Sequence, residues 1–473
     1  MMNSSALTSA TEEQTVLAVP ALELLLLQTP LNVELHQLLF NKKHALGDEL
    51  GALAHLIAVN AINAFHISGS LTNSKDAENP AWQLFMVATG YFMKGDYAIA
   101  ECWYQTVLLL DENLAAVYQN LVEIHLHFGR PYEAEVCRTR AYQLQRIFID
   151  PVLQPLRQLL ILCVGRTKGN IPYELLLSAE TSQRIKYIID YADAAEDAQL
   201  PPYDLVFNAI GEPDVAAPLL PRMQRFMQQC RRQVLNAPEV VARTQRHDLP
   251  ELMRGLEQVV VAPCIRLEAR IYPAIQLQQQ LSLSQLLFPV LVRPVESHGG
   301  QGLLLCDDIE QLQQHLLLGN AEHYVSSFID FRSADGYYRK YRVIFIDKQP
   351  YAYHLAISPH WMVHYYSADM EAHQWKIAEE ARFLQHTADV VGASGWATLL
   401  LIGQRLNLEY AGIDFTLLPN GDLFLFEANA TMLVHRVRQD GVLAHKNFYV
   451  QKIADAFEMM LVAKMATATD PKN

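Results

Sequence analysis

The sequence predicts a multidomain protein with an all-α helical repeat domain at 1–150, an α/β domain at 156–255 and an α+β domain at 256–466. Three observations support this fold class. Helical patterns in the first third repeat at a fixed spacing, apolar strand-like runs follow Pro151 and Pro155, and a strong hairpin signal lies near the C-terminal end. A chain of 473 residues has room for roughly two to four domains.

Composition and charge argue against several classes of partner. The net charge of −14 at pH 7 disfavours nucleic acid, because nucleic-acid-binding domains carry basic surfaces. The six cysteines are scattered without a CxxC pair, which indicates buried thiols in a reducing compartment rather than disulfides or a zinc site. No signal peptide is evident, and the longest apolar runs look too short to span a bilayer. We therefore expect a cytoplasmic protein without a membrane or nucleic-acid partner.

The helical patterns of the first domain repeat every 34 residues. Gly95 and Gly129 keep this spacing, as do Ala100 and Ala134. The pattern over 82–147 resembles the tetratricopeptide repeat, in which the glycine permits the turn between two helices and the alanine lets them pack closely. The resemblance implies a concave face that binds a peptide or a protein. Two alternatives stay open: the repeats pack on the rest of the chain, or they form a homodimer.

The second domain has the pattern of a small parallel sheet. The runs 156–165 and 203–214 are short and apolar and end in glycine or turn residues, as buried parallel strands do. The segments 183–192 and 219–232 have helical spacing. No GxGxxG follows the first strand, so a dinucleotide site is not expected there.

The third domain begins with closely spaced strands. A helical stretch at 371–392 and a hairpin follow, and the hairpin turn is Pro-Asn-Gly-Asp at 419–422. A last helix is expected at 447–466. The expected strands before the helical stretch lie at 258–267, 288–295, 302–307, 323–330, 337–347 and 349–358.

The stretch LFLFEANATM (423–432) raises the question of what neutralises Glu427, since a carboxylate in an apolar strand is costly to bury alone. Asn429 follows at i+2 and therefore faces the same side of the strand. Counting outward from the turn places Asp414 near the level of Glu427 on the neighbouring strand. These oxygen donors predict a Mg²⁺ site, whereas a zinc site would need thiolates or imidazoles. A strand-end carboxylate bound by backbone amides is the alternative.

A glycine-rich loop and two cations predict a phosphate-binding surface. Arg293 ends an apolar strand, and the loop His298-Gly299-Gly300-Gln301-Gly302 follows it. Glycines let backbone N–H groups approach a phosphate closely. Arg342, at the start of another apolar strand, is expected to point into the same site, with an exposed basic strand edge as the alternative.

The order of these motifs resembles the ATP-grasp superfamily, and within it the glutathione-synthetase and glutamate-ligase branch. The resemblance covers about 156–466, so the second domain corresponds to the pre-grasp domain and the third to the ATP-grasp domain. It implies that two lobes clasp ATP, that Arg293 and Arg342 are catalytic cations, and that Asp414, Glu427 and Asn429 hold Mg²⁺. The residues implied to contact the nucleotide are Arg246, Arg293, His298, Gly299, Gly300, Gly302, Val325, Ser327 and Phe328.

The resemblance also implies a reaction. A small-molecule carboxylate attacks the γ-phosphate of ATP, and an amine or thiol then displaces phosphate from the acylphosphate. Two alternatives stay open: an ATP-grasp kinase that phosphorylates a small molecule, and a non-enzymatic repeat scaffold with a degenerate nucleotide site. Arg293 stands where the family has a lysine, and Ser326-Ser327 stand where acidic or amide residues are common. The segment 354–370, dense in histidine and aromatic residues, is expected to form a lid or to line an acceptor pocket.

Overall fold

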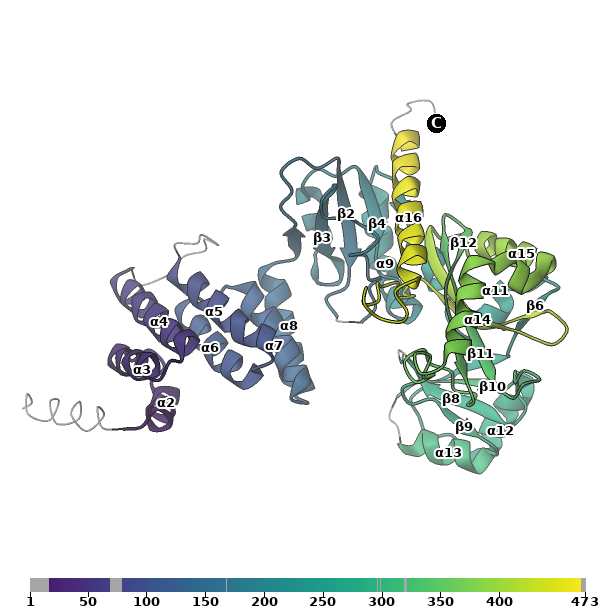
Figure 1. Cartoon of the computed structure of the whole chain (residues 1–473), viewed down its shortest axis with the longest axis horizontal. Helices are drawn as coiled ribbons and strands as arrows, with labels where there is room; N and C mark the ends of the chain where they lie inside the picture. Colours follow the sequence, from purple (N-terminus) through teal and green to yellow (C-terminus); the bar gives the residue numbers. More distant parts are fainter. Residues whose placement is uncertain are drawn as a thin grey trace, which may run out of the picture. The chain divides into compact units, whose positions relative to one another are not determined.

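The structure is a computed structural model that describes residues 17–68, 79–166, 168–295, 297, 299–318 and 321–468. The chain divides into two compact units, 1–146 and 147–473 (Figure 1). Helices make up the first unit over its described residues, whereas the second unit contains three sheets.

In the first unit, left-handed glycines connect successive helices. Gly95 and Gly129 have φ of 83° and 69°, a conformation in which a side chain would be strained. The helices that follow these glycines begin at Tyr97 and Pro131, 34 residues apart, so their spacing matches that of the sequence pattern. The helices are α2 (Val19–Gln28), α3 (Val33–Ala45), α4 (Glu49–Ser68), α5 (Pro80–Lys94), α6 (Tyr97–Leu110), α7 (Ala115–His127) and α8 (Pro131–Leu144).

One apolar helix of the first unit, α4, is longer than the apolar runs that the sequence analysis considered. Among the described residues, α4 is long and apolar enough to cross a membrane by length and composition alone. Ala54, Ala58 and Ala61 of α4 are fully buried in the core that also holds Tyr104 of α6. The helix therefore packs as a core helix of this unit.

The second unit begins with a five-stranded sheet of order β1-β3-β2-β4-β5, parallel except for the edge pair β1–β3. Both expected strands are present as β2 and β4. The helical prediction for 183–192 is wrong, because Ile185, Tyr187 and Ile188 are buried in strand β3, which pairs with β2 along its whole length. The elements are β1 (Ile147–Ile149), β2 (Arg157–Cys163), β3 (Ser182–Ile188), η1 (Ile189–Tyr191), η2 (Ala194–Gln199), β4 (Leu205–Asn208), α9 (Pro213–Gln229), β5 (Val234–Leu235), α10 (Pro238–Ala242) and α11 (Leu249–Leu252).

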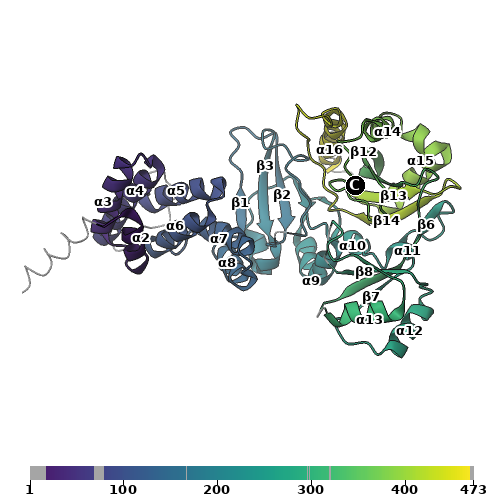
Figure 2. The same cartoon turned by 60° about the horizontal axis from the view of Figure 1, so that its bottom comes forward.

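Two further sheets lie beyond the first one (Figure 2). The second sheet is antiparallel with the order β7-β10-β8-β9, and helices α12 and α13 cover its apolar face. The third has the order β12-β11-β13-β14-β6, with only β14 and β6 parallel. The one strand expected at 258–267 is two strands, β6 (Val259–Val261) and β7 (Cys264–Leu267), which belong to different sheets. The other strands expected after residue 257 are present: β8 (Val290–Pro294), β9 (Leu304–Cys306), β10 (His323–Ser327), β11 (Tyr338–Ile346), β12 (Gln349–Ser358), β13 (Tyr410–Leu417) and β14 (Leu423–Asn429), with α12 (Ala274–Leu283) and α13 (Ile309–Leu318) between them.

Three helices complete the second unit. The expected helix at 371–392 is present as α14 (Gln374–Gln385) and the start of α15 (Thr387–Leu406), which continues further than predicted. The last helix is α16 (Lys446–Ala468). The ring of Phe457 on α16 packs against Phe207 of β4 and Tyr410 of β13. α16, yellow in Figure 1, therefore lies between the first and third sheets and joins them through a shared apolar core.

Candidate functional site

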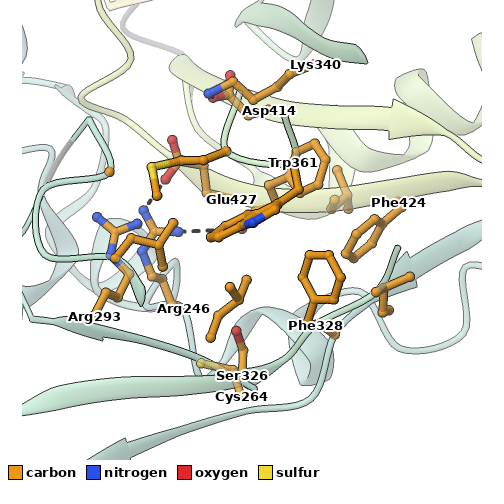
Figure 3. A pocket seen from close by; sticks show the side chains of 18 of the residues that line it. Arg246, Cys264, Arg293, Ser326, Phe328, Lys340, Trp361, Asp414, Phe424 and Glu427 are labelled. Carbon is orange, nitrogen blue, oxygen red and sulfur yellow. Dashed lines mark hydrogen bonds and ion pairs between the residues drawn. The ribbon is translucent and has the colours of Figure 1, made fainter. Parts of the chain in front are cut away.

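A cavity lies between the second and third sheets, and we call it the first cavity. Strands β7, β8 and β10 line it from one side and β11, β13 and β14 from the other. The segment Trp361–His364 also lines it. One end is aromatic and the other is charged (Figure 3).

The aromatic end is a slot only in the sense that the rings of Trp361 and several phenylalanines line it. The ring of Trp361 meets Phe328 edge to face at a centroid distance of 5.6 Å. Phe331 and Phe424 lie nearby, and Ser326 and Ser327 at the end of β10 add hydroxyl groups to the wall. A planar apolar ring system with polar edge atoms would fit such a slot.

A row of polar side chains crosses the third sheet at the charged end. The strand register places His354 of β12 opposite Arg342 of β11, Arg342 opposite Asp414 of β13, and Asp414 opposite Glu427 of β14. Directly opposed residues project from the same face of a sheet. We call these four residues the charged row. The prediction that Asp414 lies near the level of Glu427 is confirmed by this register.

Asp414 is the most buried carboxylate of the charged row, at 1% exposed. It accepts two hydrogen bonds from the Arg342 guanidinium, at 2.6 and 2.9 Å, and it pairs with Lys340 at 3.0 Å. Burial raises the pKa of Asp414, but Arg342 and Lys340 more than offset this and hold the pKa far below its usual range. Asp414 is therefore ionised and shared by two cations.

Arg246 is the direct partner of Glu427, where the sequence suggested a metal. The Arg246 guanidinium forms an ion pair with Glu427 and points toward the first cavity (Figure 3). Burial raises the pKa of Glu427, but the charges of Arg246, Arg293 and Lys340 together outweigh it, so the pKa falls to about 2. Glu427 is therefore charged at neutral pH and does not need a metal to be stable there.

Arg246 lies on the loop between α10 and α11, and a buried aspartate anchors this loop. Gln245 donates to Asp214 at the start of α9 at 2.7 Å. Asp214 also accepts from Tyr324 of β10 at 2.6 Å and from Arg266 of β7 at 2.9 Å. One carboxylate thus ties the Arg246 loop to the second sheet.

Arg293, at the end of β8, is a cation without an acidic partner among the described residues. Over the part of the chain that the structure describes, its guanidinium bonds to Ser297, through the hydroxyl at 3.1 Å and the carbonyl oxygen. Burial, together with the nearby charge of Arg246, lowers the pKa of Arg293 to about 10. A bound anion would offset both effects.

The positive charges around the charged row outnumber the negative ones. Among the described residues, four cations, Arg246, Arg293, Lys340 and Arg342, surround two ionised carboxylates. Glu212 is also close, but burial raises its pKa to about 7 against the opposing charge of Arg246, so at neutral pH it carries only part of a negative charge. The charged end of the first cavity therefore favours an anion.

The glycine-rich loop reaches over this end. Gly300 and Gly302 have φ of 74° and 70°. A Cβ atom at Gly300 would lie 2.3 Å from His364 Nε2, and one at Gly302 would lie 2.9 Å from the Pro294 ring. The loop backbone thus approaches the 361–364 segment as closely as a residue without a side chain allows. Gly299 and Gly300 line the first cavity, and His298 lies outside the described residues.

The oxygen donors suit Mg²⁺. No described group of three or more histidine, cysteine, aspartate or glutamate side chains could hold a metal alone. Asp414, Glu427 and Asn429 supply hard oxygens, and Mg²⁺ is commonly held by one or two carboxylates together with substrate phosphates. Asn429 lies on the same strand as Glu427, where its Oδ1 accepts from the Thr431 N–H at 3.0 Å. The set therefore fits a metal that arrives with phosphates.

The residues predicted to contact the nucleotide, the metal or the substrate lie in different places. Arg246, Arg293, Gly299, Gly300, Ser327 and Phe328 line the first cavity. Val325 does not, because its side chain is fully buried in the apolar core under the second sheet. Gly302 supports the loop against Pro294, and Arg342 and Asn429 face an adjoining space.

That adjoining space is a second cavity of about 780 Å³. It shares Gly299, Lys340, His364 and Glu427 with the first cavity, so the two meet at the charged row. Residues 168–172, part of 354–371 and part of 429–446 form its other walls. The segment 354–370 thus lines both cavities, as the lid-or-pocket expectation stated.

Sequence reasoning missed several lining residues. Lys340 precedes Arg342 by two positions on β11, and the strand period could have placed both on one face. Trp361 and His364 stood out only by the density of aromatic and histidine residues around them. Cys264 and Tyr324 gave no sequence signal, because they reach the cavity through the pairing of β7 with β10.

No protein-family model matches the sequence, and no curated protein matches it. Among solved structures the chain is similar to D-alanine–D-alanine ligase from Bacillus anthracis complexed with ATP, at 11% identity over 67% of this chain and 100% of that one (TM-score 0.39). It is also similar to VanG D-Ala:D-Ser ligase from Enterococcus faecalis, at 11% identity over 65% and 99% of the two chains (TM-score 0.40). A third is L-amino acid ligase from Bacillus licheniformis, at 12% identity over 64% and 75% (TM-score 0.37). These three structures are ligases. The function of this chain is inferred from its own first cavity.

Proposed function

We propose that the chain is a cytoplasmic ATP-dependent ligase of the ATP-grasp type, which joins a small-molecule carboxylate to an amine or thiol. One observation carries the proposal: a single cavity has an aromatic slot at one end and an excess of cations around Asp414 and Glu427 at the other. A nucleoside triphosphate has the matching parts, a planar base and a chain of anionic phosphates.

Each group at the charged end of the first cavity would have a separate role in binding the phosphates of ATP. Arg293, which has no described acidic partner, would bind phosphate oxygens, and Arg246 would do so beside Glu427. The N–H groups of Gly299 and Gly300 would cover the phosphate chain. Mg²⁺, held by Asp414, Glu427 and Asn429, would neutralise phosphate charge. Fixed cations of this kind stabilise the charge that spreads over the transferred phosphoryl group.

The acid substrate would enter from the second cavity. Lys340 borders both cavities and Arg342 borders the second one, so an acid bound there would face the terminal phosphate. A carboxylate oxygen would form a bond to the γ-phosphorus while the bond to the bridging oxygen of ADP breaks. The amine would then attack the acyl carbon, release phosphate and lose a proton. Positioning of the reactants supplies much of the rate enhancement in such a reaction.

The helical unit would serve a binding role. We propose that it is a tetratricopeptide-like array that recruits a peptide or protein partner. The 34-residue spacing between the starts of α6 and α8 and the left-handed glycines before them support this role.

Trapping of the acylphosphate tests the ligase proposal. The full chain is incubated with Mg²⁺, ATP, hydroxylamine and a panel of carboxylic acids, and hydroxamate and ADP are measured. A ligase yields hydroxamate and ADP in equal amounts with at least one acid, and Glu427→Gln abolishes both products. Release of ADP without hydroxamate for every acid would instead indicate a kinase. Neither product, with no ATP bound, would indicate a scaffold.

A further inference from the structure

The second cavity contains a buried histidine that is not satisfied by the described residues. His354 is 6% exposed and lines the cavity, and its Nε2 has no hydrogen-bond partner among the described residues. Its ring lies between Tyr365, at a centroid distance of 4.8 Å, and Tyr353, at 5.0 Å. A buried polar atom without a partner is costly, so such an atom on a residue that lines a cavity points to a ligand.

Cations surround this histidine. Arg342 is its direct neighbour across the strand pair in the charged row. Lys446 also lines the cavity, is 3% exposed, and lies 3.8 Å from the centroid of the Tyr365 ring. Burial lowers the pKa of His354 well below its usual value, and Arg342 and Lys446 lower it further, so the imidazole is neutral.

Lys446 is held in place by Glu380, which is fully buried. The Nζ of Lys446 lies 3.1 Å from Glu380 Oε1, and Tyr365 donates to Glu380 Oε2 at 3.0 Å. The Leu355 N–H also donates to Glu380, at 3.2 Å. Because these donors already engage Glu380, Lys446 and Tyr365 form a fixed wall and not a mobile pair.

The charge of the surroundings decides which ligand group His354 would bind. A neutral imidazole can donate from Nε2 to an anion or accept there from an ammonium group. Asp414 pairs with Arg342 and Glu380 pairs with Lys446, but each of these two cations acts on His354 more strongly than Asp414 does. Their combined charge therefore disfavours an ammonium group and favours a carboxylate. The donor role toward a carboxylate is therefore the favourable one.

The remaining walls are partly polar, with Asp369 and Glu371 among them, and an apolar part indicates what is attached to that carboxylate. Met370, Met432 and Leu443 line the cavity and are each 5% exposed or less. The volume of about 780 Å³ far exceeds what a carboxylate alone would fill. The cavity therefore suits an acid with an apolar body.

We propose that the second cavity binds a hydrophobic carboxylic acid, whose carboxylate accepts a hydrogen bond from His354 Nε2 beside Arg342 and Lys446. Met370, Met432 and Leu443 would contact its apolar body. This inference rests on the proposed function, in that the bound acid would be the carboxylate substrate of the ligase. His354 would select the acid by its charge.

Binding of a matched pair of probes to the full chain tests this inference. The probes are 3-phenylpropionate and 3-phenylpropylamine, which share a phenyl ring on a three-carbon chain and carry opposite charges, with acetate as the size control. Calorimetric titrations are run with and without Mg·ATP. We expect the acid to bind at least about tenfold more tightly than the amine or acetate. Tighter binding of the amine, or no binding of either phenyl probe, would overturn the inference.

Two variants separate the hydrogen bond from simple filling of space. His354→Leu removes the donor, and His354→Gln keeps an N–H donor on a side chain of similar reach. We expect His354→Leu to weaken 3-phenylpropionate about tenfold to a hundredfold and His354→Gln to weaken it far less. Equal affinity in all three proteins would contradict the role of His354. If His354→Leu does not fold, the relative affinities of the wild-type protein for 3-phenylpropionate and 3-phenylpropylamine decide whether the second cavity binds an acid.

Titrations of Mg·ATP on the same samples distinguish the two proposals. If Mg·ATP binds but 3-phenylpropionate does not, the inference about the acid fails and the nucleotide site stands. If 3-phenylpropionate binds but Mg·ATP does not, the acid site stands as a binding site and the ligase proposal fails.

Discussion

Two buried ion clusters of the second unit differ in their balance of charge, and this difference distinguishes a structural cluster from one that would bind a ligand. Asp197 on η2 is paired with Arg222 on α9 through two bonds of 2.6 and 2.9 Å, and Tyr187 adds a third at 2.8 Å. Neither Asp197 nor Arg222 lines the two cavities. Asp414, by contrast, is shared by two cations, and with Glu427 it borders a cavity.

The difference lies in the balance of charge, since both clusters are buried. One guanidinium satisfies Asp197, so that cluster has no remaining demand for a counter-ion. Four cations surround Asp414 and Glu427, and Arg293 among them has no described acidic partner. Buried ion pairs are common in proteins for structural reasons. An excess of one sign that faces a cavity is what indicates a ligand of the opposite sign.

The largest effect that the comparison predicts is on stability. Asp197→Asn leaves the Arg222 charge buried without a counter-ion, so the free energy of unfolding should fall by about 3–5 kcal/mol, while affinity for ATP stays unchanged. Urea unfolding and ATP titration measure the two quantities. The exposed Arg438–Asp440 pair supplies the control, and Asp440→Asn should leave both quantities unchanged. A loss of ATP affinity in Asp197→Asn would remove the distinction between the clusters.

The next effect is on the affinity for phosphates. Arg293→Ala removes the cation without a described acidic partner, so ATP should bind about ten- to a hundredfold more weakly while the free energy of unfolding stays the same or rises. Calorimetric titration measures the affinity. Arg254→Ala, at an exposed ion pair, is the matched control. Unchanged ATP affinity in Arg293→Ala would show that the excess charge has no role in binding.

The aromatic end should respond separately from the charged end. Trp361→Ala removes the ring that meets Phe328, so ATP should bind about three- to tenfold more weakly. Inorganic tripolyphosphate carries the charge without the base, so its affinity should not change. Equal weakening of both ligands would mean that Trp361 supports the cavity in general and does not contact a base.

The smallest predicted effect depends on pH. Glu212 has a pKa raised to about 7, so it loses a proton between pH 6 and pH 8 and adds negative charge near Arg246 and Arg293. The affinity of the wild-type protein for an anion should therefore fall over this range relative to Glu212→Gln. The ratio of the two affinities cancels the ionisation of ATP itself, and it should change roughly threefold. A ratio that is independent of pH would show that Glu212 does not titrate there.

The parts of the site that local chemistry determines could be predicted from the sequence. The turn Pro-Asn-Gly-Asp and the alternating strands beside it bring Asp414 close to the level of Glu427, and an irregularity of the strand pairing next to Asp414 completes the alignment. Arg293 and the glycine-rich loop follow each other directly in the chain. These features depend on neighbours in the sequence, which a pattern can capture.

Contacts between distant segments could not be predicted. Arg246 and Glu427 are 181 residues apart, so no pattern indicates that they form an ion pair. Strand β3 has helical spacing in the sequence, and its pairing with β1 and β2, which come from other parts of the chain, makes it a strand. His354 became meaningful only when the strand register placed it at the end of the charged row.

The most direct test of the central claim is a titration of ATP against the wild-type protein and Glu427→Gln, each with and without Mg²⁺. The account predicts that Mg²⁺ tightens binding to the wild-type protein at least about tenfold and that this dependence is lost in Glu427→Gln. Asp197→Asn should keep the dependence in full. Binding of ATP that is indifferent to both Mg²⁺ and Glu427, or no binding at all, would contradict the assignment of this cleft as a magnesium–nucleotide site.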